Sequence, residues 1–146
     1  MRETTCNCKY LFHFIVMIYK FEREPKSGII LIDVRLDVKY KFKMALDTGA
    51  SHTTFDINAL CMDEYPIGKI VETGLAETAN GIVKVDVFQV NSLKALGHMV
   101  CDIKVQAYDF LAHGIISRYD GVLGLDFFEN TAFRIDMKNQ TIEVEV

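Results

Sequence analysis

Apolar and polar residues alternate along most of this chain with a period of two, which is typical of β-strands that bury one face. The strands expected from this alternation are 29–36, 40–46, 82–90, 100–107, 133–137 and 141–146. A polar turn around Asp37 joins the first two, and Lys138 and Asn139 join the last two. Helical patterning is confined to residues 57–62, which end before Pro66, and to a short segment that begins near Asp126 as its cap. The pattern predicts an all-β fold, a closed or nearly closed barrel with one or two short helices.

The N-terminal region contains one strongly apolar segment, residues 10–19, with the sequence YLFHFIVMIY. The segment is too short to span a bilayer, contains His13, and is followed by charged residues instead of a small-residue cleavage site. Aromatic and β-branched residues predominate in it, which favours a long strand buried on both faces. We therefore expect an N-terminal extension, 1–27, with an extra strand, followed by one domain, 28–146. No membrane association is expected, and secretion is the alternative to a cytoplasmic location.

Composition agrees with one compact domain, because half of the 146 residues are apolar. The net charge is −4, and neither Lys nor Arg is bunched in the sequence, so nucleic acid is not an expected partner. Cys6, Cys8, Cys61 and Cys101 form neither a dense disulfide framework nor a paired metal-binding spacing. Reduced thiols and no metal or other cofactor are expected, which agrees with a cytoplasmic protein.

The most informative motif is Asp47-Thr48-Gly49, which follows an apolar strand and occurs once. An acid, a hydroxyl and a glycine in this order can hold a carboxylate where backbone amides reach it. Hydrolysis of an amide bond by carboxylates needs one group that accepts a proton and one that donates it. The simplest source of the second carboxylate is a second copy of the chain. The alternative is an ordinary turn or cap aspartate.

Residues 44–55 resemble the active-site loop of retropepsin-like aspartic proteases, single-domain enzymes that work as homodimers. Residues 119–128 resemble the hydrophobic-hydrophobic-glycine motif of that family and the short helix after it. Residues 77–82 lie between the two motifs, where the family has the tip of its flap, a mobile hairpin over the substrate. The resemblance covers residues 28–146 and implies a barrel of the retropepsin-like acid protease type.

The resemblance implies a role for each residue of the first motif. Asp47 is the expected catalytic residue, and it would lie against its symmetry mate. Thr48 would reach across the dimer axis to the partner's loop, and Gly49 would offer its amide to the carboxylate. Ala50 stands where pepsin-like enzymes carry Ser or Thr, whose hydroxyl favours the charged carboxylate. Its absence predicts a less acidic pH optimum.

Four further residues and Gly124 complete the expected site. Gly124 is expected to pack under the active-site loop, with a turn glycine as the alternative. Thr78, Ala79, Asn80 and Gly81 would form the tip of the flap and contact the substrate. The pair Asn80-Gly81 is by itself a strong signal for a type I′ hairpin turn, whereas its identity as a flap rests on the resemblance.

Three neighbouring positions modify this interpretation. Retroviral enzymes often carry an acid and an arginine at the positions of Ser51 and Leu125, and this ion pair braces their dimer. Neither charge is present here, so any dimer must be braced elsewhere. His52 is expected to face solvent, and the alternative is that it tunes the catalytic pair.

Taken together, the sequence predicts an aspartic endopeptidase that acts as a homodimer on a peptide or protein substrate. A retropepsin-like dimer that binds peptide without cutting it is one alternative. A purely structural β-barrel domain is the other.

Overall fold

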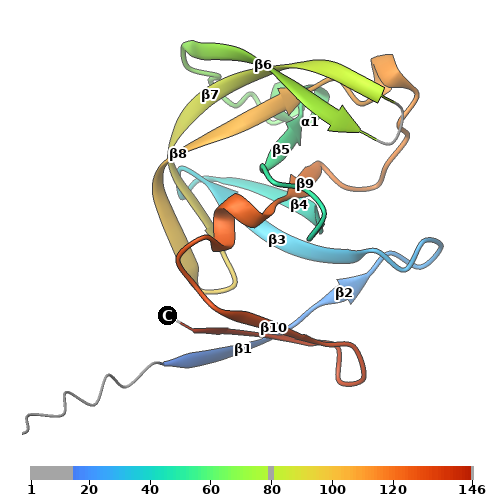
Figure 1. Cartoon of the computed structure of the whole chain (residues 1–146), viewed down its shortest axis with the longest axis vertical. Helices are drawn as coiled ribbons and strands as arrows, with labels where there is room; N and C mark the ends of the chain where they lie inside the picture. The colour runs from blue at the N-terminus through green and yellow to red at the C-terminus, as the bar shows by residue number, and fades with distance from the viewer. Residues whose placement is uncertain (1–14, 79–80, 146) are drawn as a thin grey trace, which may run out of the picture.

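The computed structural model describes residues 15–78 and 81–145, which form an almost entirely β structure (Figure 1). The strands are β1 (Val16–Lys20), β2 (Glu22–Arg23), β3 (Ile30–Leu36), β4 (Tyr40–Leu46), β5 (Thr54–Asp56), β6 (Ile70–Thr78), β7 (Gly81–Ala95), β8 (His98–Tyr108), β9 (Gly121–Leu123), β10 (Phe133–Asp136) and β11 (Thr141–Glu145). The helices are α1 (Ile57–Met62) and two 3₁₀ turns, η1 (Leu111–His113) and η2 (Leu125–Phe128). None of the helices in the described ranges is long and apolar enough to cross a membrane.

Six strands close into a barrel in the order β3-β4-β9-β5-β8-β7, because β7 also pairs with β3. The β4–β9 and β5–β8 pairs are parallel, and the other pairs of the ring are antiparallel. Strand β6 pairs only with β7 and extends the sheet as a hairpin. A second sheet, in the order β1-β11-β10, lies at the opposite end of the molecule from this hairpin (Figure 1). The predicted all-β closed barrel is confirmed.

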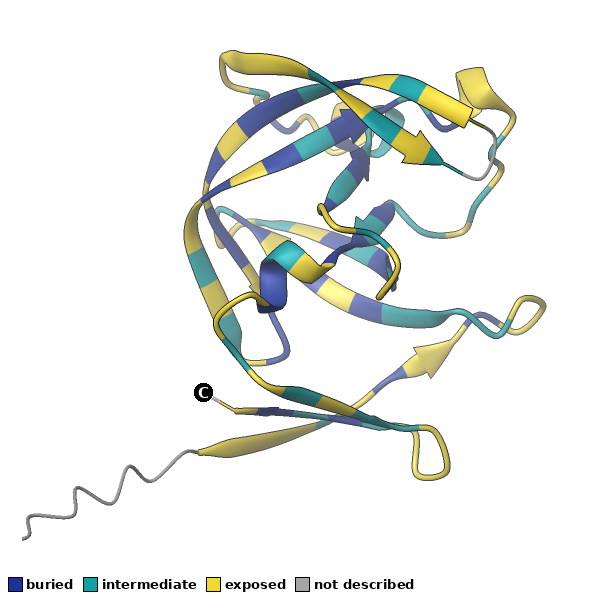
Figure 2. Ribbon diagram, in the orientation of Figure 1, coloured by how far each residue is buried: buried dark blue, intermediate teal, exposed yellow. Residues whose placement is uncertain are grey.

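The barrel interior is filled by the inward-facing residues of each strand, as the period-two pattern predicts. In β3, Ile32, Val34 and Leu36 are buried, and the residues between them are partly or fully exposed (Figure 2). Phe42 of β4 and Phe55 of β5 meet edge to face inside the barrel, with ring centroids 5.3 Å apart. Full burial of such side chains stabilises the fold by about 1.5–3 kcal/mol each.

The turn between β3 and β4 is held by its aspartate. Asp37 accepts hydrogen bonds from the Ser92 backbone amide at 3.0 Å and from the Tyr65 hydroxyl at 2.8 Å. Burial, reinforced by the bond to Asp37, raises the pKa of Tyr65 far above its usual range. Asp37 therefore ties the predicted hairpin to β7 and to the segment after α1.

The short helix α1 has the bounds that the sequence predicts, Ile57–Met62. Asp56 is its N-cap, and its carboxylate accepts a hydrogen bond from the Asn58 amide at 3.2 Å. The same carboxylate accepts from the Phe110 amide at 3.2 Å. The cap thus also connects β5 to the segment that follows β8.

The prediction of a long N-terminal strand buried on both faces was wrong for its described part. Strand β1 covers Val16–Lys20, and Ile15, Val16, Met17 and Ile18 are all exposed, Ile18 to 65%. Only Tyr19 packs against the core. The reason is that β1 is the edge strand of its sheet, so one of its edges has no partner strand among the described residues. Residues 10–14 lie outside the described ranges.

The closing hairpin of β10 and β11 matches the prediction. Strand β11 is the central strand of its sheet. It lies between β1 and β10, and its Ile142 and Val144 are completely buried. Both of its hydrogen-bonding edges are therefore occupied within the chain.

Candidate active site

Asp47 directly follows β4, at the point where the two sequence motifs meet. Leu46 pairs with Leu123 in the parallel β4–β9 ladder, and the Asp47 amide donates to the Leu123 carbonyl at 3.1 Å. The parallel pairing carries the strand that ends in Asp47 alongside the strand that ends before Gly124. Two segments far apart in the sequence thus form one structural unit.

The loop after β4 fixes the carboxylate of Asp47. The Gly49 amide donates to Asp47 Oδ1 at 2.8 Å, and the Ala50 amide donates to the Asp47 carbonyl at 3.1 Å. Asp47 and Thr48 are both exposed, and no hydrogen bond joins the Thr48 hydroxyl to another described residue. The carboxylate is therefore oriented by the backbone while its other oxygen stays accessible.

Asp47 faces a cleft of about 700 Å³. One wall consists of residues from the β6–β7 hairpin, and the rest come from the loop after β4 and from the segment around β8 and β9. The apolar residues that line the cleft are Ala50, Leu75, Ala76, Val83, Val85, Tyr108, Phe110, Ile115 and Val122. Thr54 donates to Gln106 at 3.1 Å on its polar side. Among the described lining residues, Glu77 is the one other acid.

The predicted flap lies on the hairpin that covers this cleft. Thr78 pairs with Gly81, and its hydroxyl donates to the Gly81 carbonyl at 2.9 Å. Gly81 therefore opens β7 as a paired residue and is not one of the two residues that connect the strands, contrary to the predicted Asn80-Gly81 turn. Those connecting residues, Ala79 and Asn80, lie outside the described ranges.

The structure places Gly124 directly against the active-site loop. A Cβ atom on Gly124 would lie 2.5 Å from the His52 carbonyl carbon and 2.9 Å from the Thr53 amide nitrogen. Both neighbours are backbone atoms, which cannot rotate away as a side chain does. Next to it, the Leu125 amide donates to the Ala50 carbonyl at 2.8 Å. Only glycine lets the two segments approach this closely.

One contact of the site was missed in the sequence. Asp126 is not the cap of η2, as predicted, because η2 begins at Leu125 after Gly124. Its carboxylate instead accepts from the Thr53 amide at 2.9 Å and from the Thr53 hydroxyl at 2.7 Å. Thr53 is completely buried, and its hydroxyl oxygen also accepts from the Gly124 amide at 3.2 Å. Both residues lie within the two motif segments, 44–55 and 119–128, but the contact between them appears only when the segments are brought together in the fold.

His52 and Ser51 lie at the exposed rim of the cleft. Ser51 Oγ lies 2.8 Å from His52 Nδ1, so the two side chains bond to each other. Leu125, at the position of the family's arginine, is also partly exposed. Ser51 therefore contacts its neighbour His52, and neither Ser51 nor Leu125 carries a charge.

Comparison with known proteins agrees with this geometry. Residues 32–127, which contain the cleft and both motifs, match the family described as Aspartyl protease. The chain belongs to this family. Among solved structures, it resembles the crystal structure of a retropepsin-like aspartic protease from Rickettsia conorii. The TM-score is 0.58 at 20% sequence identity, over 92% of this chain and 96% of that one. No curated protein sequence matches at a significant level.

The family member described here therefore has the retropepsin-like fold across almost its whole length. At 20% identity, the likeness concerns the backbone arrangement, and the roles of individual side chains rest on the geometry described above.

Proposed function

We propose that this chain is an aspartic endopeptidase that acts as a homodimer. The observation that carries the proposal is Asp47, a carboxylate oriented by the Gly49 amide in an apolar cleft that a β-hairpin covers. An extended peptide with apolar side chains is the substrate class that suits such a cleft. No metal or other cofactor is required for the chemistry.

In the proposed reaction, two Asp47 carboxylates from two subunits lie about 3 Å apart and share one proton. The charged carboxylate takes a proton from a water molecule, whose oxygen attacks the peptide carbonyl carbon. The protonated carboxylate donates its proton to the carbonyl oxygen. The tetrahedral intermediate then breaks its C–N bond as the amine nitrogen receives a proton, so no covalent bond to the enzyme forms.

Three features support a dimer. One chain supplies one Asp47, and the Thr48 hydroxyl has no bonding partner among the described residues. One edge of strand β1 has no partner strand in residues 15–78 and 81–145, and the side chains of Val16 and Ile18 are exposed. An uncovered apolar strand edge invites pairing with another chain. We place the subunit contact at β1, because both edges of β11, the strand next to it, are already paired.

The decisive experiment is the Asp47→Asn substitution. Asparagine has nearly the same shape but cannot accept a proton from water, so cleavage of a peptide library should fall by on the order of a thousandfold or more. Sedimentation should show the same assembly as the parent chain. Residual activity within tenfold of the parent would refute the proposal.

Glu77→Gln is the matched control, because Glu77 is the other acid among the described residues that line the cleft. If the second carboxylate comes from the partner's Asp47, the control keeps activity within about tenfold. Equal loss in both variants would instead indicate an Asp47–Glu77 pair within one chain. A parent chain that binds a transition-state mimic but cleaves nothing would be a binding module.

A further inference from the structure

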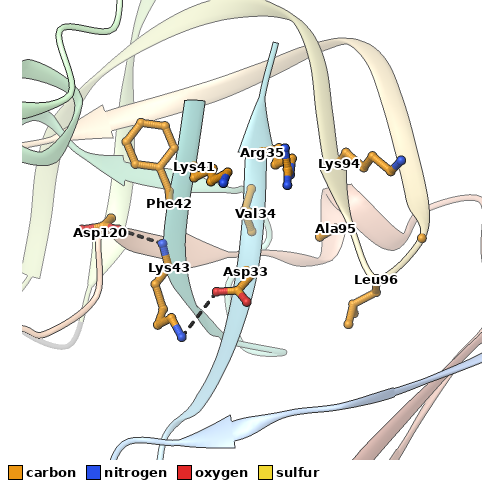
Figure 3. A pocket seen from close by; sticks show the side chains of 11 residues that line it. Asp33, Val34, Arg35, Lys41, Phe42, Lys43, Lys94, Ala95, Leu96 and Asp120 are labelled. Carbon is orange, nitrogen blue, oxygen red and sulfur yellow. Dashed lines mark hydrogen bonds and ion pairs between the residues drawn. The ribbon is translucent and has the colours of Figure 1, made fainter. Parts of the chain in front are cut away.

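Three exposed cations lie side by side on the outer face of the barrel, far apart in the sequence. Arg35 of β3 is directly opposite Lys41 of β4 and also directly opposite Lys94 of β7. Figure 3 shows the three side chains in a row across the three strands. The sequence gives no sign of this row, because only the strand register brings Lys94 next to Arg35.

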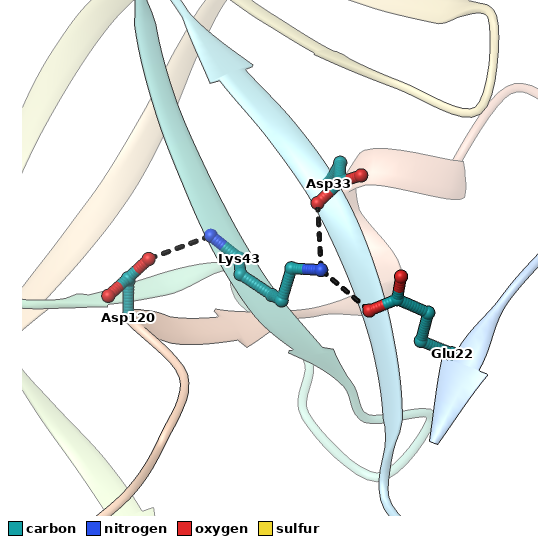
Figure 4. Close-up of polar contacts among 4 residues, drawn as sticks. All are labelled: Glu22, Asp33, Lys43 and Asp120. Carbon is teal, nitrogen blue, oxygen red and sulfur yellow. Dashed lines mark hydrogen bonds and ion pairs between the residues drawn. The ribbon is translucent and has the colours of Figure 1, made fainter. Parts of the chain in front are cut away.

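The charges of this row are not compensated within the described chain. No ion pair or hydrogen bond joins Arg35, Lys41 or Lys94 to another described residue. The neighbouring Lys43 differs, because it contacts Glu22 at 2.8 Å and Asp33 at 3.4 Å (Figure 4). Lys43 thus pairs with Asp33, which lies two residues before Arg35 in β3, and no described acid forms an ion pair with the row.

Two further acids, Asp63 and Glu64, line a hollow together with Lys41. Neither of them is within ion-pair distance of Lys41, so they do not neutralise its charge. Like charges directly opposite each other on paired strands destabilise a sheet. The row contains two such pairs, so the free chain contains a repulsion that a bound anionic group would relieve.

The row lines an open groove of about 560 Å³ (Figure 3). Phe42, Ala95 and Leu96, which are buried side chains, also line it. The groove is separate from the cleft, because Lys41 precedes Asp47 by six residues of an extended strand. At a rise of ~3.3 Å per residue this places them about 20 Å apart.

We propose that this groove binds an acidic segment of a protein in an extended conformation. Neighbouring strands are about 4.8 Å apart, so the row is about 10 Å wide. Carboxylates at alternate positions of an extended peptide are about 7 Å apart, so two of them fit within the row. Arg35, at its centre, offers the planar fork that binds a carboxylate through two parallel hydrogen bonds.

The groove favours a peptide over a nucleic acid. Asp33 and Asp120 line the same groove as the cations, on the side of Lys43 (Figures 3 and 4). A continuous phosphate backbone would run into these carboxylates, whereas a peptide can place a neutral or basic residue there. The chain as a whole also carries a net charge of −4, which opposes a long polyanion.

The test uses direct binding, in the Asp47→Asn chain so that no peptide is cut. The probe is a fluorescein-labelled peptide in which Asp alternates with Ser, measured by fluorescence anisotropy at low and at physiological salt. The double substitution Arg35→Gln and Lys94→Gln should weaken binding at least tenfold. The pair Lys69→Gln and Lys84→Gln, which removes the same charge from exposed residues that do not line the groove, should leave it unchanged.

No binding of the acidic peptide at low salt, or equal loss in both double variants, would overturn the proposal. An oligonucleotide that binds more tightly than the acidic peptide, and that is weakened as much by the Arg35→Gln and Lys94→Gln substitutions, would instead indicate a nucleic acid site and overturn the proposal. The result does not depend on the proposed protease activity. A chain that binds the acidic peptide but cleaves no substrate would contradict the endopeptidase alone.

Discussion

The carboxylate of Asp126 holds both the amide and the hydroxyl of Thr53, which lies 73 residues earlier in the chain. Thr53 is the last residue before β5, and Asp126 belongs to η2. The same Thr53 hydroxyl accepts from the Gly124 amide. This network connects the loop that contains Asp47 to the segment that follows β9. The position of the Asp47 carboxylate therefore depends on both segments.

Removal of this carboxylate should destabilise the fold. Asp126→Ala leaves the buried amide and hydroxyl of Thr53 without their acceptor, which costs about 1–3 kcal/mol of the free energy of unfolding. Urea denaturation followed by circular dichroism measures this. Asp126→Asn keeps one acceptor oxygen and should lose less. Glu129→Ala, a nearby exposed position, should change stability by no more than about 0.5 kcal/mol.

The close approach of Gly124 to the active-site loop gives a second prediction. Gly124→Ala adds a methyl group 2.5 Å from a backbone atom of His52, so the loop must shift. The free energy of unfolding should fall by about 1–3 kcal/mol, as in other overpacked sites, and peptide cleavage should fall with it.

Gly68→Ala is the matched control, because a Cβ atom there meets nothing within 4 Å. Its free energy of unfolding should stay the same or rise by about 0.4–1 kcal/mol, because alanine lowers the conformational entropy of the unfolded chain. Equal destabilisation by the two substitutions would show that contact with the loop is not the reason for glycine at position 124.

The third prediction concerns pH. Ala50 borders the cleft beside Asp47 and has no hydroxyl to donate to a charged carboxylate. We expect a bell-shaped rate profile with a maximum at roughly pH 4.5–6.5. In Ala50→Ser the new hydroxyl favours the charged form, so the acidic limb of the profile should move to lower pH. If the acidic limb stays at the same pH or moves to higher pH, the residue at position 50 does not set the ionisation of the two carboxylates.

The fourth prediction tests the subunit contact at β1. Ile18 is exposed and lies opposite Glu143 in the β1–β11 ladder. In Ile18→Lys the new lysine can pair with Glu143 across the strands, so the single chain should stay folded. An apolar contact between subunits at this position would be weakened, because it would now contain a charge. Sedimentation should show a dimer dissociation constant raised at least tenfold. Activity should fall most at low concentration, where the rate rises with the square of chain concentration.

Met62→Lys is the control for this prediction, because Met62 is 84% exposed on α1 and far from β1 in sequence. It should leave dimerisation unchanged. Full activity from a chain that sediments as a monomer, with a rate strictly linear in concentration, would contradict the dimeric mechanism.

The sequence by itself determined the elements whose signals are local. The alternation of apolar residues predicted β3, β4 and the closing hairpin, because each of these strands buries one face. The bounds of α1 followed from the helical pattern of residues 57–62 and from the proline beyond its end. The motif of Asp47 predicted the family, and the predicted contact of the Gly49 amide with the carboxylate is present after β4.

Only the tertiary structure decided the relationships between distant segments. The Asp126–Thr53 network and the row of Arg35, Lys41 and Lys94 arise from strand register, which no local pattern specifies. The exposure of β1 has the same origin. Its apolar residues predict burial, but burial requires a neighbour on each side, and the order of strands in the sheet leaves β1 at an edge. Local chemistry thus determined which residues form the strands and the loop, and packing determined what each of them contacts.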